Sequence, residues 1–356
     1  MPAWNEEVGL LPTVKSILKS TYSDIEIIVV NDGSTDHSDQ QMIDFISDYK
    51  KNPKEGINII YHYQENQGKG TALNKGIALS TGEIIVTIDA DCEVHENALT
   101  NFVACFADKS VMAAVGNVKV GNTSSIIGMT QYLEFIFSFY FKKADSFFGS
   151  IYIIGGAAGA FRKSIFEKIG TYSDQNITED IELTVRIQKA GMKIVYASDA
   201  IVYTEGASDI IGLKKQRIRW KRGRIDTFIQ HRDLFFSKKK QHNKFLTWFI
   251  LPFTIFGDTQ ILLEIPFIIF LIVLSFITRD FTPFIATLSI ITFVFYIQSI
   301  SEIKNNSVNP YLLAPIAWLM FYLVTIIEIN ALFTTLPDVL AKRELKWQKW
   351  ERKGVK

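Results

Sequence analysis

Two scarcities limit what this chain of 356 residues can be: it has only two cysteines, and its net charge is +1. Cys92 and Cys105 fall in a region that is expected to face the cytosol, where disulfides are rare, and their spacing fits no metal motif. We therefore expect two free structural thiols. A nearly neutral chain gives no reason to expect a nucleic acid partner.

Charged residues are scarce from Phe245 to Leu336, whereas Met1 to Lys244 has an ordinary mixed composition. This change predicts a globular domain followed by a membrane domain. Phe281–Ser301 carries no charge and is long enough to span a bilayer. Tyr311–Leu336 predicts a second span. The interrupted apolar stretch Phe245–Thr278 is either one kinked span or two short segments.

Basic residues near these spans predict the membrane orientation only in part. Lys238-Lys239-Lys240, beside the first apolar stretch, favours a cytosolic globular domain. The tail carries further basic residues that favour the cytosol, namely Lys342, Arg343, Lys346, Lys349, Arg352, Lys353 and Lys356. Three spans would place this tail outside the cell, so the charge of the tail favours an even number of spans. Hydropathy instead favours three spans. The predicted domains are 1–236 (globular), 237–340 (membrane helices) and 341–356 (basic tail).

Two carboxylates follow a short apolar run in the globular part. The run Ile84–Ile88 is predicted to be a strand buried on both faces, as in a parallel sheet. Asp89 and Asp91 come where this strand ends, and ligands of open α/β sheets bind at the carboxyl ends of strands. Alternation directs both acids to one side, where they can address one divalent cation and the diphosphate that it neutralises. The alternative is an ordinary acidic turn.

A glycine-containing loop precedes this strand. Asn66–Gly76 leads into a helix, where its amides and Lys69 can form an anion site. The spacing is not that of a P-loop, which excludes a nucleotide triphosphatase of that kind. Alternating strands and helices predict a mainly parallel sheet. A βαβ unit would also need a strand before Met1, so we expect the first strand to be missing from this sequence.

Several stretches nearer the membrane part each have two interpretations. Ile177–Leu183 is either a helix start, with a threonine cap and acids in its first turn, or part of an active site. Gln216–Trp220 lies in a basic helical stretch that could rest on lipid headgroups. The small residues in Ile153–Arg162 either let a sugar approach the backbone or pack tightly. Ser124–Phe148 is predicted to be a helix, either in the core or facing the membrane.

Four of these motifs, Pro2–Glu6, Val30–Asp36, Gly68-Lys69 and Asp89–Asp91, together resemble a family 2 glycosyltransferase. Gln216-Arg217-Ile218-Arg219-Trp220 is similar to the Q-x-x-R-W motif of its processive membrane branch, which includes cellulose, chitin, hyaluronan and poly-N-acetylglucosamine synthases. The resemblance covers residues 2 to about 236. It implies an α/β GT-A domain with a mainly parallel sheet, followed by an α-helical transmembrane domain. After the motif, the letters W-K-R-G-R depart from the family's R-W-A-Q-G, which leaves the sugar open.

The resemblance implies which residues bind the donor, a UDP-sugar. These are Asn5, Glu6, Asp32, Lys69 and Asp89. The first three would hold the uridine end, and the last two would lie near the diphosphate and ribose. Asp91 would bind the metal ion, Mg²⁺ or Mn²⁺.

The resemblance also implies the catalytic residues. Asp180, with Glu179 beside it, would be the general base that takes a proton from the acceptor hydroxyl in an inverting transfer. Gln216, Arg219 and Trp220 complete the set, because an arginine can stabilise a departing diphosphate and a tryptophan face can stack on a sugar ring.

We therefore expect an inverting processive β-glycosyltransferase that polymerises a UDP-sugar, by resemblance UDP-N-acetylglucosamine. It would be a multi-pass protein of the cell (inner) membrane with a cytosolic catalytic domain. Its expected partners are the donor, a growing polysaccharide or lipid acceptor, the bilayer and a small accessory membrane subunit, but no nucleic acid. Asp258, Glu264 and Glu328 either line a polymer path or lie at helix ends.

Two alternatives to this function exist, and the second comes from another class of function. A non-processive transferase would add one sugar to a lipid, but such enzymes generally lack the motif at Gln216–Trp220. A transporter could keep a degenerate nucleotide-binding domain as a scaffold. The intact carboxylates Asp32, Asp89, Asp91 and Asp180 argue against such decay.

Overall fold

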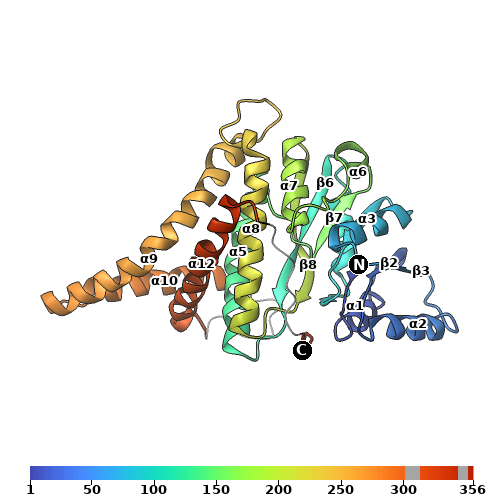
Figure 1. Ribbon diagram of the computed structural model, residues 1–356, viewed down its shortest axis with the longest axis horizontal. Coiled ribbons are helices and arrows are strands. Elements are labelled where there is room, and N and C mark those ends of the chain that lie inside the picture. The colour runs from blue at the N-terminus through green and yellow to red at the C-terminus, as the bar shows by residue number, and fades with distance from the viewer. Residues whose placement is uncertain (301–312, 344–351, 356) are drawn as a thin grey trace.

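The computed structural model describes residues 1–300, 313–343 and 352–355 (Figure 1). Expectations for Ser301, Tyr311, Lys346, Lys349 and Lys356 fall outside these residues. The strands are β1 (Pro2–Ala3), β2 (Ile25–Asp32), β3 (Ile57–Gln64), β4 (Ile84–Thr87), β5 (Cys92–Val94), β6 (Val111–Val120), β7 (Gly159–Arg162) and β8 (Lys193–Thr204).

Helices surround these strands and then continue into a separate apolar group. Those of the α/β domain are α1 (Leu10–Ile17), α2 (Ser38–Tyr49), α3 (Lys69–Leu79), α4 (Ala98–Cys105), α5 (Ile126–Phe147), α6 (Ser164–Ile169), α7 (Glu179–Lys189) and α8 (Ile210–Gln230). The apolar group is α9 (Leu251–Thr278), preceded by a π-helical turn at Leu246–Ile250, then α10 (Thr282–Ile300) and α12 (Ala317–Leu340).

The first sheet has the strand order β1-β2-β3 and is parallel throughout. Its register pairs Ala3 with Asn31 and Asp32 with Gln64, so the loops after the three strands meet at one edge. No strand is predicted at Pro2 and Ala3, yet these residues form the short strand β1, which pairs with β2. A further strand before Met1 stays a prediction.

The second sheet has the order β4-β7-β6-β8-β5. Strands β6 and β8 are parallel, whereas β7 runs antiparallel to β4 and β6, and β5 antiparallel to β8. The prediction that Ile84–Ile88 is a strand buried on both faces of a parallel sheet is therefore wrong. This strand ends one side of the sheet order, pairs antiparallel with β7, and has half-buried side chains at Ile84, Ile85 and Val86.

Helix α5 forms as predicted, and one of its faces agrees with the core interpretation. The membrane-facing interpretation stays a prediction. One face, including Tyr132, Leu133 and Ile136, is buried in a cluster shared with α10 and α12. The other face exposes Phe141 and Phe147. The helix therefore lies between the α/β domain and the apolar helices, as Figure 1 shows.

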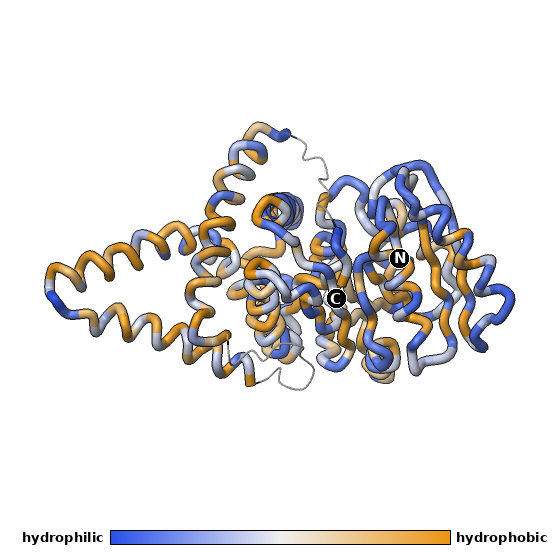
Figure 2. The backbone as a smooth tube through the Cα atoms, turned by 90° about the horizontal axis from the view of Figure 1, so that it is seen from below, coloured by the Kyte–Doolittle hydropathy of each residue, from blue (hydrophilic) through white to orange (hydrophobic). Residues whose placement is uncertain are grey.

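Three helical segments are long and apolar enough to cross a membrane: Leu246–Thr278, Thr282–Ile300 and Ala314–Leu340. The first is one continuous helix with Pro266 inside it, which decides between the two interpretations of that stretch. Helices α9 and α10 form an apolar hairpin that projects away from the sheets in both views (Figures 1 and 2). Helix α12 instead packs along α8 (Figure 1).

The basic side chains of α8 contact acids rather than lipid headgroups. Lys221 is 3% exposed and lies 2.7 Å from both Asp258 of α9 and Glu328 of α12. Arg224 donates to both oxygens of Asp258 at 2.6 and 2.7 Å. The interpretation of α8 as a lipid-binding basic helix is wrong for these residues.

Arg217 extends this buried network to a fourth helix, α5. Its guanidinium forms a bidentate pair with Glu134 of α5 at 2.6 and 2.5 Å and lies 3.6 Å from Glu328. Asp258 and Glu328 are therefore ion-pair partners of α8. They lie inside α9 and α12, so the interpretation that they lie at helix ends is wrong, and a role along a polymer path stays a prediction. Glu264 accepts a hydrogen bond from Thr325 of α12 at 3.2 Å.

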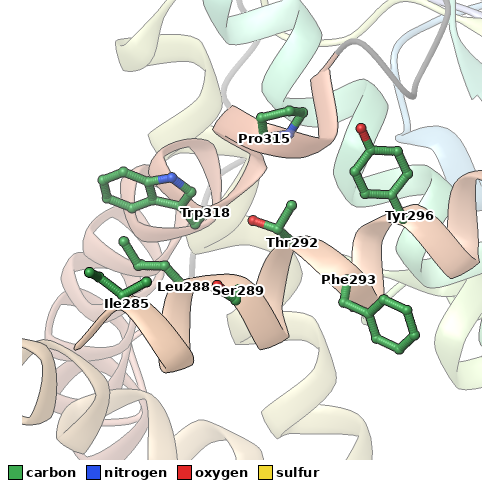
Figure 3. Close-up of a pocket in the computed structure, with 8 residues that line it drawn as sticks. All are labelled: Ile285, Leu288, Ser289, Thr292, Phe293, Tyr296, Pro315 and Trp318. Carbon is green, nitrogen blue, oxygen red and sulfur yellow. The ribbon is translucent and has the colours of Figure 1, made fainter. Parts of the chain in front are cut away.

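A cavity of about 380 Å³ lies between α10 and the start of α12 (Figure 3). No residue of the motifs lines it. Its lining residues are Ile285, Leu288, Ser289, Thr292, Phe293, Tyr296, Pro315 and Trp318.

The buried network makes a prediction about stability. Asp258→Asn leaves Lys221 with Glu328 as its one anionic partner and removes the anionic partner of Arg224. Removing one partner of a buried ion pair costs about 3 kcal/mol. We expect a lowered thermal unfolding midpoint in detergent. The control is Asp338→Asn, whose pair with Arg343 is exposed on α12 and whose loss should cost less than about 1 kcal/mol. Equal effects of the two substitutions would contradict the prediction.

Candidate active site

The centre of the candidate site is an ion pair between the loop after β3 and the loop after β4, which belong to different sheets. Lys69 begins α3, and its Nζ lies 2.6 Å from Asp89 Oδ1 and 3.4 Å from Glu179 Oε1. Gly156 closes over this pair, because a β-carbon there would lie 2.7 Å from Lys69 Nζ. The structure thus brings together Lys69, Asp89 and Glu179, which lie far apart in the sequence.

Asp32 shapes the loop that presents Lys69. The carboxylate is 3% exposed, and its oxygens accept hydrogen bonds from the backbone amides of Gln67 at 3.0 Å and Gly68 at 2.8 Å. Gly68 has φ +94°, a conformation that favours glycine. Asp32 therefore holds the turn at the N-terminus of α3.

The N-terminal motif is bound to the loop after β2. Asn5 has φ +54°, accepts a hydrogen bond from the Thr35 amide at 2.7 Å, and donates its own amide to Ser34 Oγ at 2.9 Å. The Glu6 amide donates to Ser38 Oγ at 2.9 Å. These contacts place Asn5 and Glu6 beside the loop that contains Asp32.

Asp91 shares a cationic partner, Arg352, with Glu6 and does not pair with Lys69 as Asp89 does. It is 7% exposed, and its Oδ2 lies 2.6 Å from Nη2 of Arg352, in the C-terminal segment. Arg352 Nε lies 3.5 Å from Glu6 Oε2. Asp89 and Asp91 therefore have different cationic partners in this structure.

The motif at Ile177–Leu183 forms the start of α7, as predicted, but Thr178 does not cap it through its side chain. Asp180 is held at both oxygens, since Oδ2 accepts from the Gly156 amide at 3.0 Å and Oδ1 from the Ile181 amide at 2.8 Å. Its neighbour Glu179 is 6% exposed. This carboxylate pair therefore adjoins the Lys69–Asp89 pair.

The Q-x-x-R-W helix meets α7 through a glycine. A β-carbon at Gly223 of α8 would overlap the side chain of Thr178, so the two helices are in close contact there. Burial lowers the pKa of Arg219, while the nearby negative charges of Glu179, Asp180 and Asp89 act to raise it. The structure therefore brings Arg219 to the three carboxylates.

Trp220 and Gln216 take positions that the sequence does not reveal. The Arg217 guanidinium lies over the Trp220 ring, 4.5 Å from its centroid, so one face of the indole is already covered. The Gln216 side-chain oxygen is buried and has no hydrogen bond partner among the described residues.

The charges of the site depend on one another. Burial alone would lower the pKa of Lys69, but Asp89, Glu179 and Asp180 outweigh burial and raise it. Burial raises the pKa of Glu179, with Lys69 acting against it. Burial would also raise the pKa of Asp89, but Lys69 holds it below its usual range. Neutral Lys69 is therefore disfavoured, and the site keeps a fixed cation.

Asp91 fits a metal ion that arrives with a phosphate-bearing ligand. The described residues contain no group of three His, Cys, Asp or Glu that could hold a metal ion. Magnesium is commonly bound by one or two carboxylates together with substrate phosphates. A buried carboxylate whose oxygen now contacts a guanidinium is a suitable hard oxygen donor.

Sequence reasoning missed three residues of this region. Gly156 covers the Lys69–Asp89 pair, Glu205 lies directly after β8, and Arg352 comes from the far end of the chain. The small-residue run was a signal for Gly156, although the same run also packs tightly at Ala158 and Ala160, which are fully buried. Cys92 and Cys105 are free, as predicted.

The parallel sheet, the D-x-D carboxylates and the anion loop define a nucleotide-diphospho-sugar transferase of the GT-A class. In agreement, a mannosyltransferase from Pyrobaculum calidifontis, solved with GDP-Man and Mn²⁺, superimposes with a TM-score of 0.63 at 19% identity. The match covers 96% of this chain and 86% of that one. At this identity the likeness concerns the fold.

Residues 1–170 match the model of glycosyl transferase family 2, so the chain carries a family 2 glycosyltransferase domain. Poly-beta-1,6-N-acetyl-D-glucosamine synthase of Staphylococcus epidermidis is 29% identical over 84% of this chain and 72% of its own length. The probable glycosyltransferase YdaM of Bacillus subtilis is 29% identical over 99% and 86%. The Staphylococcus aureus synthase of the same name is 31% identical over 67% and 56%.

The close contact between α8 and α7 makes a prediction. Gly223→Ala would push α8 away from Thr178, so we expect a loss of about 1–3 kcal/mol of stability from overpacking and a fall in transfer rate as Arg219 moves. The control is Gly257→Ala in α9, where a β-carbon meets no atom within 4 Å. Melting curves and initial rates of both variants check this. A normal rate in Gly223→Ala would contradict the role of the contact.

Proposed function

We propose that this protein is an inverting processive β-glycosyltransferase that builds a polysaccharide at the membrane from a UDP-sugar, with UDP-N-acetylglucosamine as the donor. One observation carries the proposal: Lys69, Asp89, Glu179, Asp180 and Arg219 converge at one place. The Staphylococcus relatives are named as poly-beta-1,6-N-acetyl-D-glucosamine synthases, and this supports the choice of sugar.

The donor would lie across the edge where the loops of the first sheet meet. Asn5, Glu6 and Asp32 would surround the uridine end, and Asp32 would act partly by holding the amides of Gln67 and Gly68 in place. Lys69 and Asp89 would lie beside the ribose and diphosphate.

Asp91 would hold a divalent cation, which supplies positive charge against the diphosphate as it departs. Arg219 would add a second positive charge on the leaving-group side, since guanidinium groups pair well with phosphates. Lys69 keeps its charge because three carboxylates surround it. This chain's own residues thus stabilise the UDP that leaves.

Asp180 would act as the general base. Its carboxylate is oriented by the Gly156 and Ile181 amides, which fixes the direction in which it can accept a proton. As the acceptor oxygen bonds to the anomeric carbon, its proton passes to Asp180 and the bond from that carbon to the diphosphate oxygen breaks. Glu179 beside it is tied to Lys69, which leaves Asp180 as the carboxylate for this step.

The same residues could transfer one sugar to a lipid, and the intact Gln216–Trp220 segment favours the processive reaction instead. Trp220 keeps one face that Arg217 does not cover. An acceptor sugar would stack on that face. Incubating membranes with labelled UDP-sugars and measuring product length separates a polymer from a single addition.

We further propose a multi-pass arrangement in the cell (inner) membrane with the catalytic domain in the cytosol. The α9–α10 hairpin would cross twice. An even number of crossings then requires that α12 does not make a full third crossing, although it is long and apolar enough to span and the sequence predicts a span there. The position of Arg352 against Asp91 supports this, because the tail then returns to the catalytic side. An even number of crossings agrees with the basic tail.

Cysteine labelling tests this arrangement. In a Cys105→Ser background, Asp280→Cys at the α9–α10 turn should react with an impermeant maleimide in intact cells. Lys353→Cys should react only after the cells are permeabilised. Labelling of Lys353→Cys in intact cells would show that the tail lies outside.

Two aspartate variants separate chemistry from binding. Asp180→Asn should leave UDP affinity nearly unchanged and lower the transfer rate by about 10²–10⁴, the usual contribution of a general base. Asp32→Asn should weaken UDP binding first, because an amide cannot accept from Gln67 and Gly68 at both atoms. Calorimetric UDP titration and polymer formation measure the two effects. If Asp180→Asn abolishes UDP binding, the motif is only a helix start.

A further inference from the structure

The C-terminal segment 352–355 lies in the middle of the acidic region that contains Asp91. Two carboxylates, Glu6 and Asp91, are each 7% exposed and both contact Arg352. A third, Glu205, is 3% exposed. Buried carboxylates that lie together need a compensating cation, and in this structure the tail supplies it.

The backbone of the segment is also held. Glu205 accepts hydrogen bonds from the amide of Lys353 at 2.6 Å and from that of Gly354 at 3.0 Å. Glu205 is itself joined to the motif, since its amide donates to the Asp91 carbonyl at 3.3 Å. One residue therefore positions the tail so that Arg352 reaches Asp91. The Lys353 side chain is exposed.

The contact is incompatible with metal binding at the same oxygen. Asp91 Oδ2 lies 2.6 Å from the guanidinium, and a divalent cation would need this lone pair and would repel the arginine. Binding of a cation at this oxygen, together with a diphosphate, therefore requires Arg352 to leave. The net free energy of cation binding is therefore less favourable, because the contacts of the tail are lost when the cation binds.

Resting on the donor site proposed above, we propose that residues 352–355 form a removable latch. Arg352 occupies Asp91 when no donor is bound, Glu205 holds the latch in place, and the divalent cation with the nucleotide diphosphate displaces it. The latch lets the donor site open only when cation and nucleotide arrive together. It also keeps the buried carboxylates compensated between turnovers.

Calorimetry on the full chain in nanodiscs tests the exchange, with UDP titrated in the presence of Mn²⁺. Arg352→Gln removes the competing cation, so we expect Mn²⁺·UDP to bind about tenfold more tightly than to the wild type, the effect of one charge-assisted contact. Lys353→Gln removes the same charge one residue away and should bind like the wild type. Equal or weaker binding by Arg352→Gln would overturn the latch.

Hydrogen exchange at the Lys353 and Gly354 amides gives a second readout without turnover. These amides should exchange slowly in the metal-free wild type and at least about tenfold faster with Mn²⁺·UDP. In the Glu205→Gln variant, the Lys353 and Gly354 amides should exchange fast both with and without Mn²⁺·UDP. Unchanged exchange on adding Mn²⁺·UDP would also overturn the latch. If no variant binds Mn²⁺·UDP, the donor site itself is wrong, a result distinct from equal binding by all variants.

Discussion

The contact of Lys221 with Asp258 and Glu328 is the interaction on which the arrangement depends. It joins α8 to α9 and α12 at the point where the α/β domain meets the apolar helices. Replacing such a group with apolar residues is often neutral for stability, but removing one partner is costly. The network therefore fixes how α8 sits against the apolar helices more than it raises stability.

The position of α8 in turn decides the geometry of the candidate site. Its opposite face meets α7 at Gly223 and Thr178, and this contact brings Arg219 to Glu179 and Asp180. A helix that binds the membrane helices on one side and the carboxylates on the other can couple the two parts. The proposed growth of a polymer at a membrane would use such a fixed relation between the transfer site and the apolar helices.

The sequence predicts the order of elements, because buried strands and glycine loops have strong local patterns. Its motifs also name Lys69, Asp89 and Glu179, which the structure brings together. It cannot predict the setting of Ile84–Ile88, since an edge strand beside antiparallel β7 has the same apolar letters as a buried parallel strand. It also cannot reveal that Lys221 is buried, because its acidic partners lie 37 and 107 positions away.

The C-terminal tail shows that the sequence also fails to predict some contacts of the candidate site. A basic C-terminus predicts an orientation in the membrane, but nothing in its letters indicates that Arg352 reaches Asp91 across the chain. The two motifs at Asp32 and Asp180 are different, because their partners lie in loops that the local pattern already predicts. Long-range pairs of charges are what the sequence leaves undetermined.

A double-mutant cycle on Lys221 and Glu328 tests the central claim that the buried network holds α8 and, through it, the transfer site. Lys221→Met, Glu328→Gln and the double variant would be compared with the wild type in initial transfer rate and in unfolding midpoint. We expect each single variant to have a lower transfer rate and a lower unfolding midpoint than the wild type. The double variant should be destabilised by less than the sum of the two single effects, with a coupling free energy of about 0.5–3 kcal/mol. Additive effects, or a normal transfer rate in all three variants, would contradict the account.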